Sequence, residues 1–471
     1  MNAPRDSAHA ADLDRLLAQQ RAAFAREPYP AARVRRDRLA RLLRVLEDER
    51  AWVHAVDEDF GRRSSHETRL AELYVVAAEA RLARRHVARW MRPRRVLTPL
   101  RLWPGTARIV PQPRGVVGVI SPWNYPVQLA LAPVVAAIAA GNRVMLKPSE
   151  LTPATSSLLA ERTSRHFAAD EVAVVQGDAA VGEAFSRLPL DHLFFTGSTT
   201  VGRRVAMAAA ENLTPVTLEL GGKSPALFDS DADFDRLAPR LMVGKLLNAG
   251  QTCIAPDYAL VPSEKVDAFV RAVQRATEAL YPEASRARDY TAIVNARHHA
   301  RLCALLDDAK AGGARIVTLG TVGGHPRQLA PAVVIGVDER MAIMREEIFG
   351  PLLPVETYVD LDDAIAKIRA RPHPLALYWF GRDRAHLARV LRETHSGGVT
   401  VNDTLWHFAH EGLPFGGVGA SGNGAYHGEH GFRTFTLDKP VFVQRRVAPS
   451  ALLYPPYGKG FERLLSILRR L

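Results

Sequence analysis

The sequence contains little cysteine and no long apolar run. Cys253 and Cys303 are its only cysteines among 471 residues, whereas a secreted protein of this size that depended on disulfides would usually carry more. The most apolar stretch, residues 127–140, is interrupted by Gln128 and Pro133. It is shorter than a membrane-spanning helix, which needs about 20 residues. The N-terminus also lacks the apolar segment of a secretory signal. We therefore expect a soluble protein of the cytoplasm.

Lysine is scarce as well, and the positive charge gathers at the two ends of the chain. The formal net charge is +12, and only eight of the 62 basic residues are lysines. Residues 1–100 carry a net +7 and residues 441–471 a net +5, so residues 101–440 are neutral. Basic ends fit a non-catalytic nucleic-acid-binding protein. Such a protein is the alternative to an enzyme. We expect no nucleic-acid partner, because the arginines of residues 33–44 follow one solvated helix face without interleaved aromatic or glycine residues.

The order of the apolar segments predicts the fold class. With 47% hydrophobic and 24% charged residues, the chain has the composition of a globular protein with a large core. Residues 10–95 show helical spacing, and later strands alternate with helices, which is typical of a doubly wound parallel sheet. A second α/β unit runs from about residue 220 to 405. We expect strands at 116–120, 143–146, 172–175, 193–195, 226–228 and 258–261, and helices at 127–140, 152–167 and 265–280.

Three polar residues are candidates for catalysis. Cys253 lies in a loop of small and polar residues, where a thiolate can attack a carbonyl carbon and later leave from a thioester. Glu219 ends an apolar strand before two glycines, where burial would raise its pKa and suit it as a general base. Asn124 follows the first strand, and its neutral NH₂ group suits an oxyanion. The plainer alternatives are a buried cysteine, a carboxylate that caps backbone amides and a turn asparagine. Cys303 sits in a helical apolar pattern, so we expect it in the core.

Two further strand ends carry residues suited to a dinucleotide. Lys147 and Glu150 follow the second strand, and such side chains can hold ribose hydroxyls at the carboxyl edge of a sheet. The strand at 193–195 runs into a glycine- and serine-containing helix start, whose amides can bind phosphate. The alternatives are a solvated loop and an ordinary helix cap. The residues of this helix start are Gly197, Ser198, Thr199, Thr200, Val201 and Gly202.

Two patterns invite interpretations that we reject. The only G-x-G-x-x-G match, residues 417–422, does not follow a strand, and the dinucleotide fingerprint needs a strand before it and a helix after it. Histidines at 407, 410, 427 and 430 come without the cysteine or carboxylate framework of a metal site. We therefore expect no metal.

Six motifs in order resemble the aldehyde dehydrogenase superfamily. The candidate base and nucleophile, Glu219 and Cys253, are 34 positions apart, as that family's pattern expects. The motifs are Pro122-Trp123-Asn124, Lys147-Pro148-Ser149-Glu150, Phe195-Thr196-Gly197-Ser198, Leu218-Glu219-Leu220-Gly221-Gly222-Lys223, Gly250-Gln251-Thr252-Cys253 and Glu346-Glu347-Ile348-Phe349-Gly350-Pro351.

The resemblance implies a role for each matched position. Cys253 is then the nucleophile, Asn124 and the Cys253 N–H form the oxyanion site, and Glu219 activates the water that hydrolyses the thioester. The cofactor is NAD or NADP. Its contacts are then Lys147 and Glu150 on the ribose, Gly197 to Gly202 on the pyrophosphate, and Glu347 and Phe349 on the nicotinamide side.

Within that superfamily the chain is most similar to class 3 and coniferyl aldehyde dehydrogenases. Residues 248–258, 413–419 and 454–457 carry this likeness. It implies an aromatic phenylpropanoid such as coniferyl aldehyde, or a medium- or long-chain aliphatic aldehyde, as substrate. A CoA-acylating or semialdehyde dehydrogenase is the alternative within the family, and the presence of Glu219 argues against CoA acylation. The rings of Tyr125, Trp406 and Phe408 are candidates for an apolar substrate pocket, and a core role is the alternative.

The resemblance also implies a domain organisation and a homodimer. Residues 1–218, with 407–440 returning to them, form a cofactor-binding domain, and residues 219–406 form a catalytic domain. Residues 441–471 form a bridging tail that ends in an amphipathic helix candidate at 461–471. We expect this helix to pack on the partner subunit rather than to contact an anionic membrane surface, which is the alternative.

Overall fold

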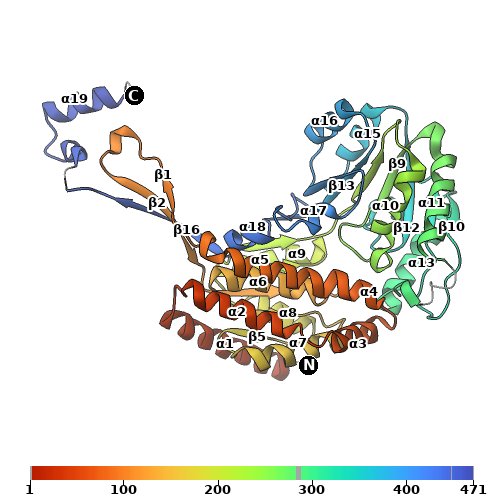
Figure 1. Cartoon of the computed structure of the whole chain (residues 1–471), viewed down its shortest axis with the longest axis horizontal. Coiled ribbons are helices and arrows are strands. Elements are labelled where there is room, and N and C mark those ends of the chain that lie inside the picture. Colours follow the sequence, from red (N-terminus) through yellow and green to blue (C-terminus); the bar gives the residue numbers. More distant parts are fainter. Residues whose placement is uncertain (1–2, 283–287, 447, 470–471) are drawn as a thin grey trace.

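The computed structural model describes residues 3–282, 288–446 and 448–469. Two large sheets form the body, and a third, three-stranded sheet forms an arm that projects from it (Figure 1). Strands alternate with helices in both large sheets, and their strands run parallel apart from one edge strand in each. The expected α/β class and doubly wound first sheet are therefore confirmed.

The first sheet has six strands in the order β15-β7-β6-β3-β4-β5. Its five longer strands are parallel, and only β15 runs antiparallel, beside β7. The first four predicted strands match β3, β4, β5 and β6, each apolar because helices cover both faces of the sheet. The bounds are β3 (Val116–Ile120), β4 (Arg143–Lys147), β5 (Val172–Val174), β6 (His192–Thr196), β7 (Val216–Glu219) and β15 (Gly422–Asn423).

Helices from both ends of the sequence cover this sheet. Every residue of α6 is buried, which explains why its sequence is apolar on all sides. The helices are α1 (Ala3–Arg26), α2 (Ala32–Val45), α3 (Glu49–Phe60), α4 (Ser65–Glu67), the π-helix η1 (Thr68–Tyr74), α5 (Val75–Trp90), α6 (Gln128–Ala140), α7 (Pro153–His166), α8 (Ala179–Ser186), α9 (Thr199–Ala210) and α18 (Gly428–Thr434).

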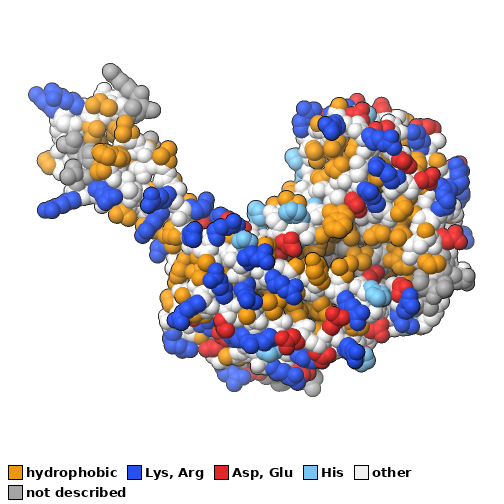
Figure 2. All heavy atoms as spheres, in the orientation of Figure 1, with side chains coloured by type: hydrophobic (Ala, Val, Ile, Leu, Met, Phe, Trp, Pro, Cys, Tyr) orange, Lys and Arg blue, Asp and Glu red, His pale blue; other side chains and the backbone are white. Residues whose placement is uncertain are grey.

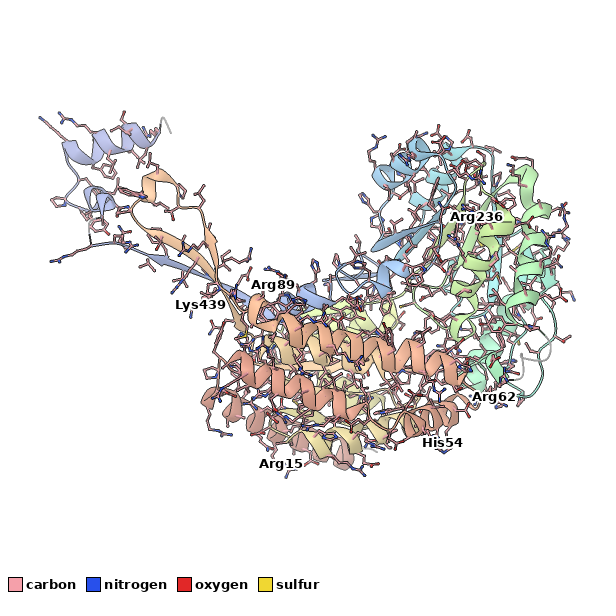
Figure 3. All side chains as sticks on the ribbon, viewed as in Figure 1. Arg15, His54, Arg62, Arg89, Arg236 and Lys439 are labelled. Carbon is pink, nitrogen blue, oxygen red and sulfur yellow. The ribbon has the colours of Figure 1, made fainter. Side chains whose placement is uncertain are left out.

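The arginines of the N-terminal helices are not all solvated, and that part of the sequence interpretation was wrong. Arg15 is exposed on the outer helical layer, as expected (Figure 3). Arg35 and Arg38 are only 1% and 4% exposed. Arg38 pairs with Glu171 and Glu27 at 2.9 and 3.1 Å, so that its charge is compensated where the helix meets the sheet.

The second sheet has seven strands in the order β10-β11-β12-β9-β8-β13-β14, with only β10 antiparallel. Its strands are β8 (Pro225–Phe228), β9 (Tyr258–Pro262), β10 (Arg315–Thr318), β11 (Ala332–Ile335), β12 (Leu352–Tyr358), β13 (Ala376–Phe380) and β14 (Gly398–Val401). Its helices are α10 (Phe234–Leu246), η3 (Leu247–Gly250), η4 (Ser263–Lys265), α11 (Val266–Leu280), α13 (Ala296–Ala311), α14 (Ala342–Arg345), α15 (Leu361–Arg369), α16 (Arg384–Glu393) and α17 (Trp406–Ala409).

The arm combines two segments that are far apart in the sequence. Strand β2 pairs antiparallel with β16, from Thr436 opposite Pro113 to Val443 opposite Thr106. The sequence analysis grouped residues 94–113 with the cofactor-binding domain. Their strand β2 pairs with β16, which begins in the returning segment 407–440 and ends in the predicted tail. The elements of the arm are β1 (Arg94–Val96), η2 (Leu100–Leu102), β2 (Thr106–Pro113), β16 (Thr436–Val443), η5 (Pro449–Leu453) and α19 (Lys459–Leu468).

Helix α19 covers most of the predicted tail helix, whose last two residues lie outside the described part of the chain. None of the described helices has the length and apolar character that a membrane crossing requires. Arg89 and Lys439 lie where the arm leaves the body (Figure 3).

Candidate active site

Two of the three catalytic candidates lie at the carboxyl end of a strand or in the loop that follows it, and the third lies in a loop before a strand. Strand β7 ends at Glu219, and Asn124 lies in the loop that joins β3 to α6. Cys253 lies between η3 and β9 of the second sheet. The loops at the carboxyl ends of parallel strands are the usual binding edge of such sheets. The first sheet presents this edge to the site, whereas the second sheet contributes the loop that leads into β9.

The loop before Cys253 has an unusual backbone. Asn248, Ala249 and Gly250 all have positive φ angles, of 53°, 51° and 76°. The carbonyl oxygen of Gly350 would lie 2.3 Å from a Cβ at position 250, so only glycine fits there. Gln251 stabilises this turn, because its side chain donates to the Asn248 and Ala292 carbonyls at 3.0 and 3.1 Å. The strained turn is therefore held by directed hydrogen bonds, as is usual near functional sites.

Cys253 is half-buried, and its surroundings disfavour the thiolate. Burial raises its pKa to about 12, and the nearby carboxylates of Glu347 and Glu219 raise it further in the same direction. The backbone N–H groups of Cys253 and Ile254 interact with the sulfur and lower the pKa in part. The thiol must therefore lose its proton before the sulfur can attack a carbonyl carbon.

Glu219 is the candidate for a general base that acts on water. It is 3% exposed, and neither carboxylate oxygen has a hydrogen-bond partner among the described residues. Burial raises its pKa well above the ordinary value of 4.5. A carboxylate that caps backbone amides would show those bonds, so this geometry favours the general-base interpretation over the structural one.

Asn124 keeps one donor available. It is 3% exposed, and its Nδ2 atom donates to the Gln251 carbonyl at 3.1 Å. Because an amide NH₂ group carries two hydrogens, the second remains for another acceptor. The hydrogen bond also ties the Asn124 loop directly to the loop that carries Cys253, two residues away from the nucleophile.

Glu347 and Phe349 lie in the loop between α14 and β12. Burial raises the pKa of Glu347 to about 8, and Asp257 raises it further. Its Oε1 atom is buried without a hydrogen-bond partner in the described part of the chain. A Cβ at Gly221 would lie 2.1 Å from Glu347 Oε2, so the first glycine after Glu219 makes room for this carboxylate. Phe349 has a positive φ of 50° and packs edge-on against Trp123, with ring centroids 5.3 Å apart.

Two residues to which sequence reasoning gave no role hold this second loop. Lys223 pairs with Asp257 and donates to the Ile343 and Glu346 carbonyls at 2.8 and 2.9 Å. Asp257 in turn accepts from the Ile348 N–H at 2.8 Å. Both residues belong to the quoted motifs, but only the three-dimensional structure shows that they form one ion pair beneath Glu347.

The predicted cofactor residues offer groups that fit a dinucleotide. Lys147 Nζ lies 2.9 Å from Glu150 Oε2 at the end of β4. Burial alone would raise the pKa of Glu150, but the hydrogen bond and charge of Lys147 hold it below its ordinary value. Ser198 is the N-cap of α9, and its side chain accepts from the Val201 N–H; the amides of such a helix start can bind phosphate. A Cβ at Gly202 would lie 2.6 Å from the side chain of Leu220, which explains the small residue in this helix. These carboxylate, ammonium and amide groups suit ribose hydroxyls and a pyrophosphate.

The predicted substrate residues differ in their surroundings. Tyr125 is 6% exposed, and its hydroxyl lies 2.7 Å from Thr252 Oγ1. Trp406 is 63% exposed, whereas Phe408 is half-buried and packs edge-on against Phe415 at 4.9 Å. Cys303 is half-buried on α13 rather than fully in the core, so that expectation was only partly right.

The histidines have partners other than a metal. His407 Nδ1 lies 2.8 Å from Thr400 Oγ1, and His427 stacks on Phe415. Among the residues that the structure describes, no three His, Cys, Asp or Glu side chains come close enough to hold a metal ion. Residues 417–422 lead into β15, which begins at Gly422, and do not join a strand to a helix, which agrees with the rejection of the fingerprint.

Comparisons with known proteins agree with the family resemblance. The model of the "Aldehyde dehydrogenase family" matches residues 3–441. A "Probable coniferyl aldehyde dehydrogenase" from Pseudomonas aeruginosa is 50% identical over 454 residues, which cover 96% of this chain and 95% of that protein. The "Coniferyl aldehyde dehydrogenase" of a Pseudomonas species is 48% identical and covers 92% of this chain and 91% of its own length. The solved "Substrate bound state of Staphylococcus Aureus AldH" has a TM-score of 0.92 at 38% identity, covering 97% of this chain and 99% of that one.

The likeness spans both large sheets and the loops between them, so it is not confined to one domain. An enzyme of this family over nearly the whole chain excludes the alternative of a non-catalytic nucleic-acid-binding protein. This chain therefore belongs to the aldehyde dehydrogenase family and is an enzyme that oxidises aldehydes.

Proposed function

We propose that this enzyme oxidises an aromatic aldehyde of the coniferyl type to its carboxylic acid with NAD or NADP, through a thioester on Cys253. The observation that carries the proposal is the buried, unpartnered carboxylate of Glu219, whose charge acts on the Cys253 thiol. A nucleophile and a base of this kind fit a reaction in which acyl transfer to sulfur is followed by hydrolysis.

In the first step the Cys253 thiol gives its proton to solvent, and the sulfur adds to the aldehyde carbon to form an anionic thiohemiacetal. The negative charge that develops on the aldehyde oxygen is stabilised by the free N–H of Asn124 and by the Cys253 N–H. Loss of hydride from the former aldehyde carbon converts this oxyanion into the carbonyl of a thioester. When bound, the nicotinamide ring supplies the hydride acceptor.

In the second step Glu219 removes a proton from water, and the oxygen of that water attacks the thioester carbon. The C–S bond breaks, the carboxylic acid leaves, and the Cys253 sulfur recovers a proton. Glu219 supports hydrolysis over transfer to CoA, because an enzyme that uses a thiol acceptor does not need a base to activate water. CoA acylation is the second candidate, and addition of CoA distinguishes the two.

The predicted cofactor contacts are part of the same proposal. Lys147 and Glu150 would hold a ribose, the N-terminal amides of α9 a pyrophosphate, and Glu347 and Phe349 the nicotinamide side. The fit rests on the Lys147–Glu150 pair, the Ser198 cap and the unpartnered Oε1 of Glu347. These contacts fit NAD and NADP alike, because Lys147 would attract the 2′-phosphate of NADP whereas Glu150 would repel it.

The substrate proposal rests on relatives of 48 and 50% identity that are named for coniferyl aldehyde. Medium- and long-chain aliphatic aldehydes are the competing class, and Tyr125, Trp406 and Phe408 stay candidate substrate contacts. The test is a panel of coniferyl, benzyl-type and straight-chain aldehydes with each cofactor, followed by absorbance of the reduced nicotinamide. A higher kcat/KM for the straight-chain aldehydes would contradict the aromatic assignment.

We also propose a cytoplasmic homodimer that assembles through the arm. Exposed apolar side chains cover the arm, among them Leu97, Leu100, Trp103 and Tyr457 (Figure 2). Strands β1 and β16 are the edges of its sheet, and such edges and patches favour a second copy as their partner. Sedimentation of the full chain and of a chain ending at residue 440 tests this, because a truncated chain that stays dimeric would contradict it.

A further inference from the structure

Three charged residues lie buried next to the proposed site and take no part in the chemistry described above. Arg63, Glu67 and Glu72, here called the Arg63 cluster, are 3%, 9% and 0% exposed. They lie just after α3, in the arginine-rich N-terminal region, for which the sequence analysis predicted no catalytic role. Burial of three charges is costly unless each is paired and hydrogen-bonded, so their partners identify what the cluster does.

A π-helix brings both carboxylates to the same side. Glu67 and Glu72 are five residues apart, which would place them about 140° apart around a regular α-helix. The π-helix Thr68–Tyr74 begins directly after Glu67. Because its hydrogen bonds join residues five apart, it stacks such residues above one another, and π-helical turns are often found at functional sites.

The guanidinium of Arg63 joins the carboxylates to the loop of the oxyanion donor. Its Nη1 atom donates to the Asn124 carbonyl at 2.9 Å. Its Nη2 atom lies 3.4 Å from Glu72 Oε1, and its Nε atom 3.9 Å from Glu67 Oε2. The same guanidinium lies 5.0 Å from the centre of the Tyr125 ring. Arg63 therefore contacts two consecutive residues of the loop between β3 and α6.

Each carboxylate binds the backbone of one of the two active-site loops. Glu72 Oε2 accepts from the N–H groups of Val127 and Gln128, three and four residues after Asn124, at 3.0 and 2.9 Å. Glu67 Oε2 accepts from the Asn248 N–H at 3.1 Å, in the strained turn before Cys253. One cluster thus holds the donor loop and the nucleophile loop at once.

The two loops are also bonded to each other where the cluster holds them. Asn248 Nδ2 donates to the Asn124 carbonyl at 2.9 Å, the same oxygen that accepts from Arg63. The Tyr125 hydroxyl lies 2.7 Å from Thr252, the neighbour of Cys253. A shift of Arg63 would therefore move Asn124 relative to the nucleophile.

We propose that Arg63, Glu67 and Glu72 are positioning residues that hold the Asn124 donor in register with Cys253 for the developing oxyanion. The inference rests on the proposed roles of Asn124 and Cys253. Well-packed apolar residues would often serve stability equally well, whereas directed bonds from one cluster to both loops provide the fixed geometry that oxyanion stabilisation requires.

The deciding variants are Arg63→Lys and Arg63→Met, with Arg35→Lys and Arg35→Met as matched controls. Arg35 is 1% exposed and donates to the Ala139 carbonyl at 3.0 Å, at the other end of α6. Like Arg63, Arg35 is a buried arginine beside α6, but it lies away from both active-site loops. Arg63→Lys keeps the charge between the carboxylates while losing the planar fork, which protects the fold.

Two measurements separate positioning from a general structural effect. The first turnover, measured as formation of reduced nicotinamide, passes through the oxyanion and so depends on the oxyanion site. Alkylation of Cys253 by iodoacetamide displaces iodide and forms no oxyanion. We expect both Arg63 variants to slow the first turnover about 10- to 100-fold. Alkylation, the KM for the cofactor and the circular dichroism should stay within about twofold of the wild type, and the Arg35 variants should change none of them.

A double-mutant cycle with Asn124→Ala tests the route of the effect. If Arg63 acts through Asn124, the loss in Arg63→Met/Asn124→Ala equals that of Asn124→Ala alone rather than the product of the two losses. Independent, multiplicative losses would overturn the inference, as would an Arg63→Lys protein that is misfolded or slow in both measurements. Asn124→Ala with undiminished first turnover would instead overturn the proposed oxyanion role, so the two failures are distinguishable.

Discussion

Replacement of Glu219 by glutamine should separate the two halves of the reaction. Glutamine has the same shape as glutamate but cannot take a proton from water. Because neither oxygen of Glu219 has a hydrogen-bond partner among the described residues, the change breaks no bond that the structure shows. It also removes a group whose ionisation burial disfavours, so the free energy of unfolding should be unchanged or higher.

The expected loss follows from the role of a general base, which contributes about 10²- to 10⁴-fold to a rate. This corresponds to roughly 3 to 5 kcal/mol in the barrier of thioester hydrolysis. In the proposed mechanism the thiol proton goes to solvent, so formation of the thioester on Cys253 does not require Glu219. The variant should therefore release about one equivalent of reduced nicotinamide per site quickly and then continue at the slow rate.

The assay is stopped-flow absorbance of reduced nicotinamide across a range of pH. In the wild type the rate of hydrolysis should rise with pH, because Glu219 acts as a base only in its ionised form and burial has raised its pKa. In Glu219→Gln that rise should disappear. Glu347→Gln is the matched control, since it removes the other carboxylate near Cys253 and should change the KM for the cofactor more than the hydrolysis rate. A Glu219→Gln protein with a steady rate within twofold of the wild type would refute the assignment.

Three further predictions concern other parts of the molecule. Cys253→Ser should lower aldehyde oxidation by at least about 10³-fold with an unchanged fold, and appreciable retained activity in a cofactor-linked assay would exclude Cys253 as the nucleophile. Glu150→Gln should improve kcat/KM for NADP relative to NAD about tenfold, because it removes a negative charge near the proposed ribose site; an unchanged ratio would place Glu150 elsewhere. Arg41 and Arg38 outweigh the effect of burial and lower the pKa of Glu171 from 4.5 to about 2, so Glu171→Gln should lower the free energy of unfolding by about 2 kcal/mol at neutral pH. That difference from the wild type should shrink as the pH falls from about 5 toward 2, and chemical denaturation that shows no such trend would contradict the pairing.

The parts of the fold that sequence patterns predicted are those built from local signals. Strands β3 and β4 are continuous apolar runs because both faces of the sheet are covered, and α6 is apolar on every side because it is buried throughout. The arm was not predicted, since the pairing of β2 with β16 joins residues more than 300 positions apart. Nothing in either segment alone indicates the other.

The same distinction applies to the site. Cys253 and Glu219 stand in short glycine-containing motifs whose chemistry can be recognised without the fold. Arg63 stands among many arginines, and its burial depends on Glu72 and on the carbonyl of Asn124, which is 61 positions away. A pattern of arginines predicts a solvated face by default, and only the three-dimensional structure shows which of them are enclosed.

The most direct test of the account is to observe the covalent intermediate. Glu219→Gln, mixed with coniferyl aldehyde and NAD and quenched in acid within the first turnover, should carry one acyl group per chain. Digestion and mass spectrometry should place that group on the peptide that contains Cys253, and Cys253→Ser treated in the same way should carry none. An unmodified Cys253 in a protein that has already released one equivalent of reduced nicotinamide would contradict the account.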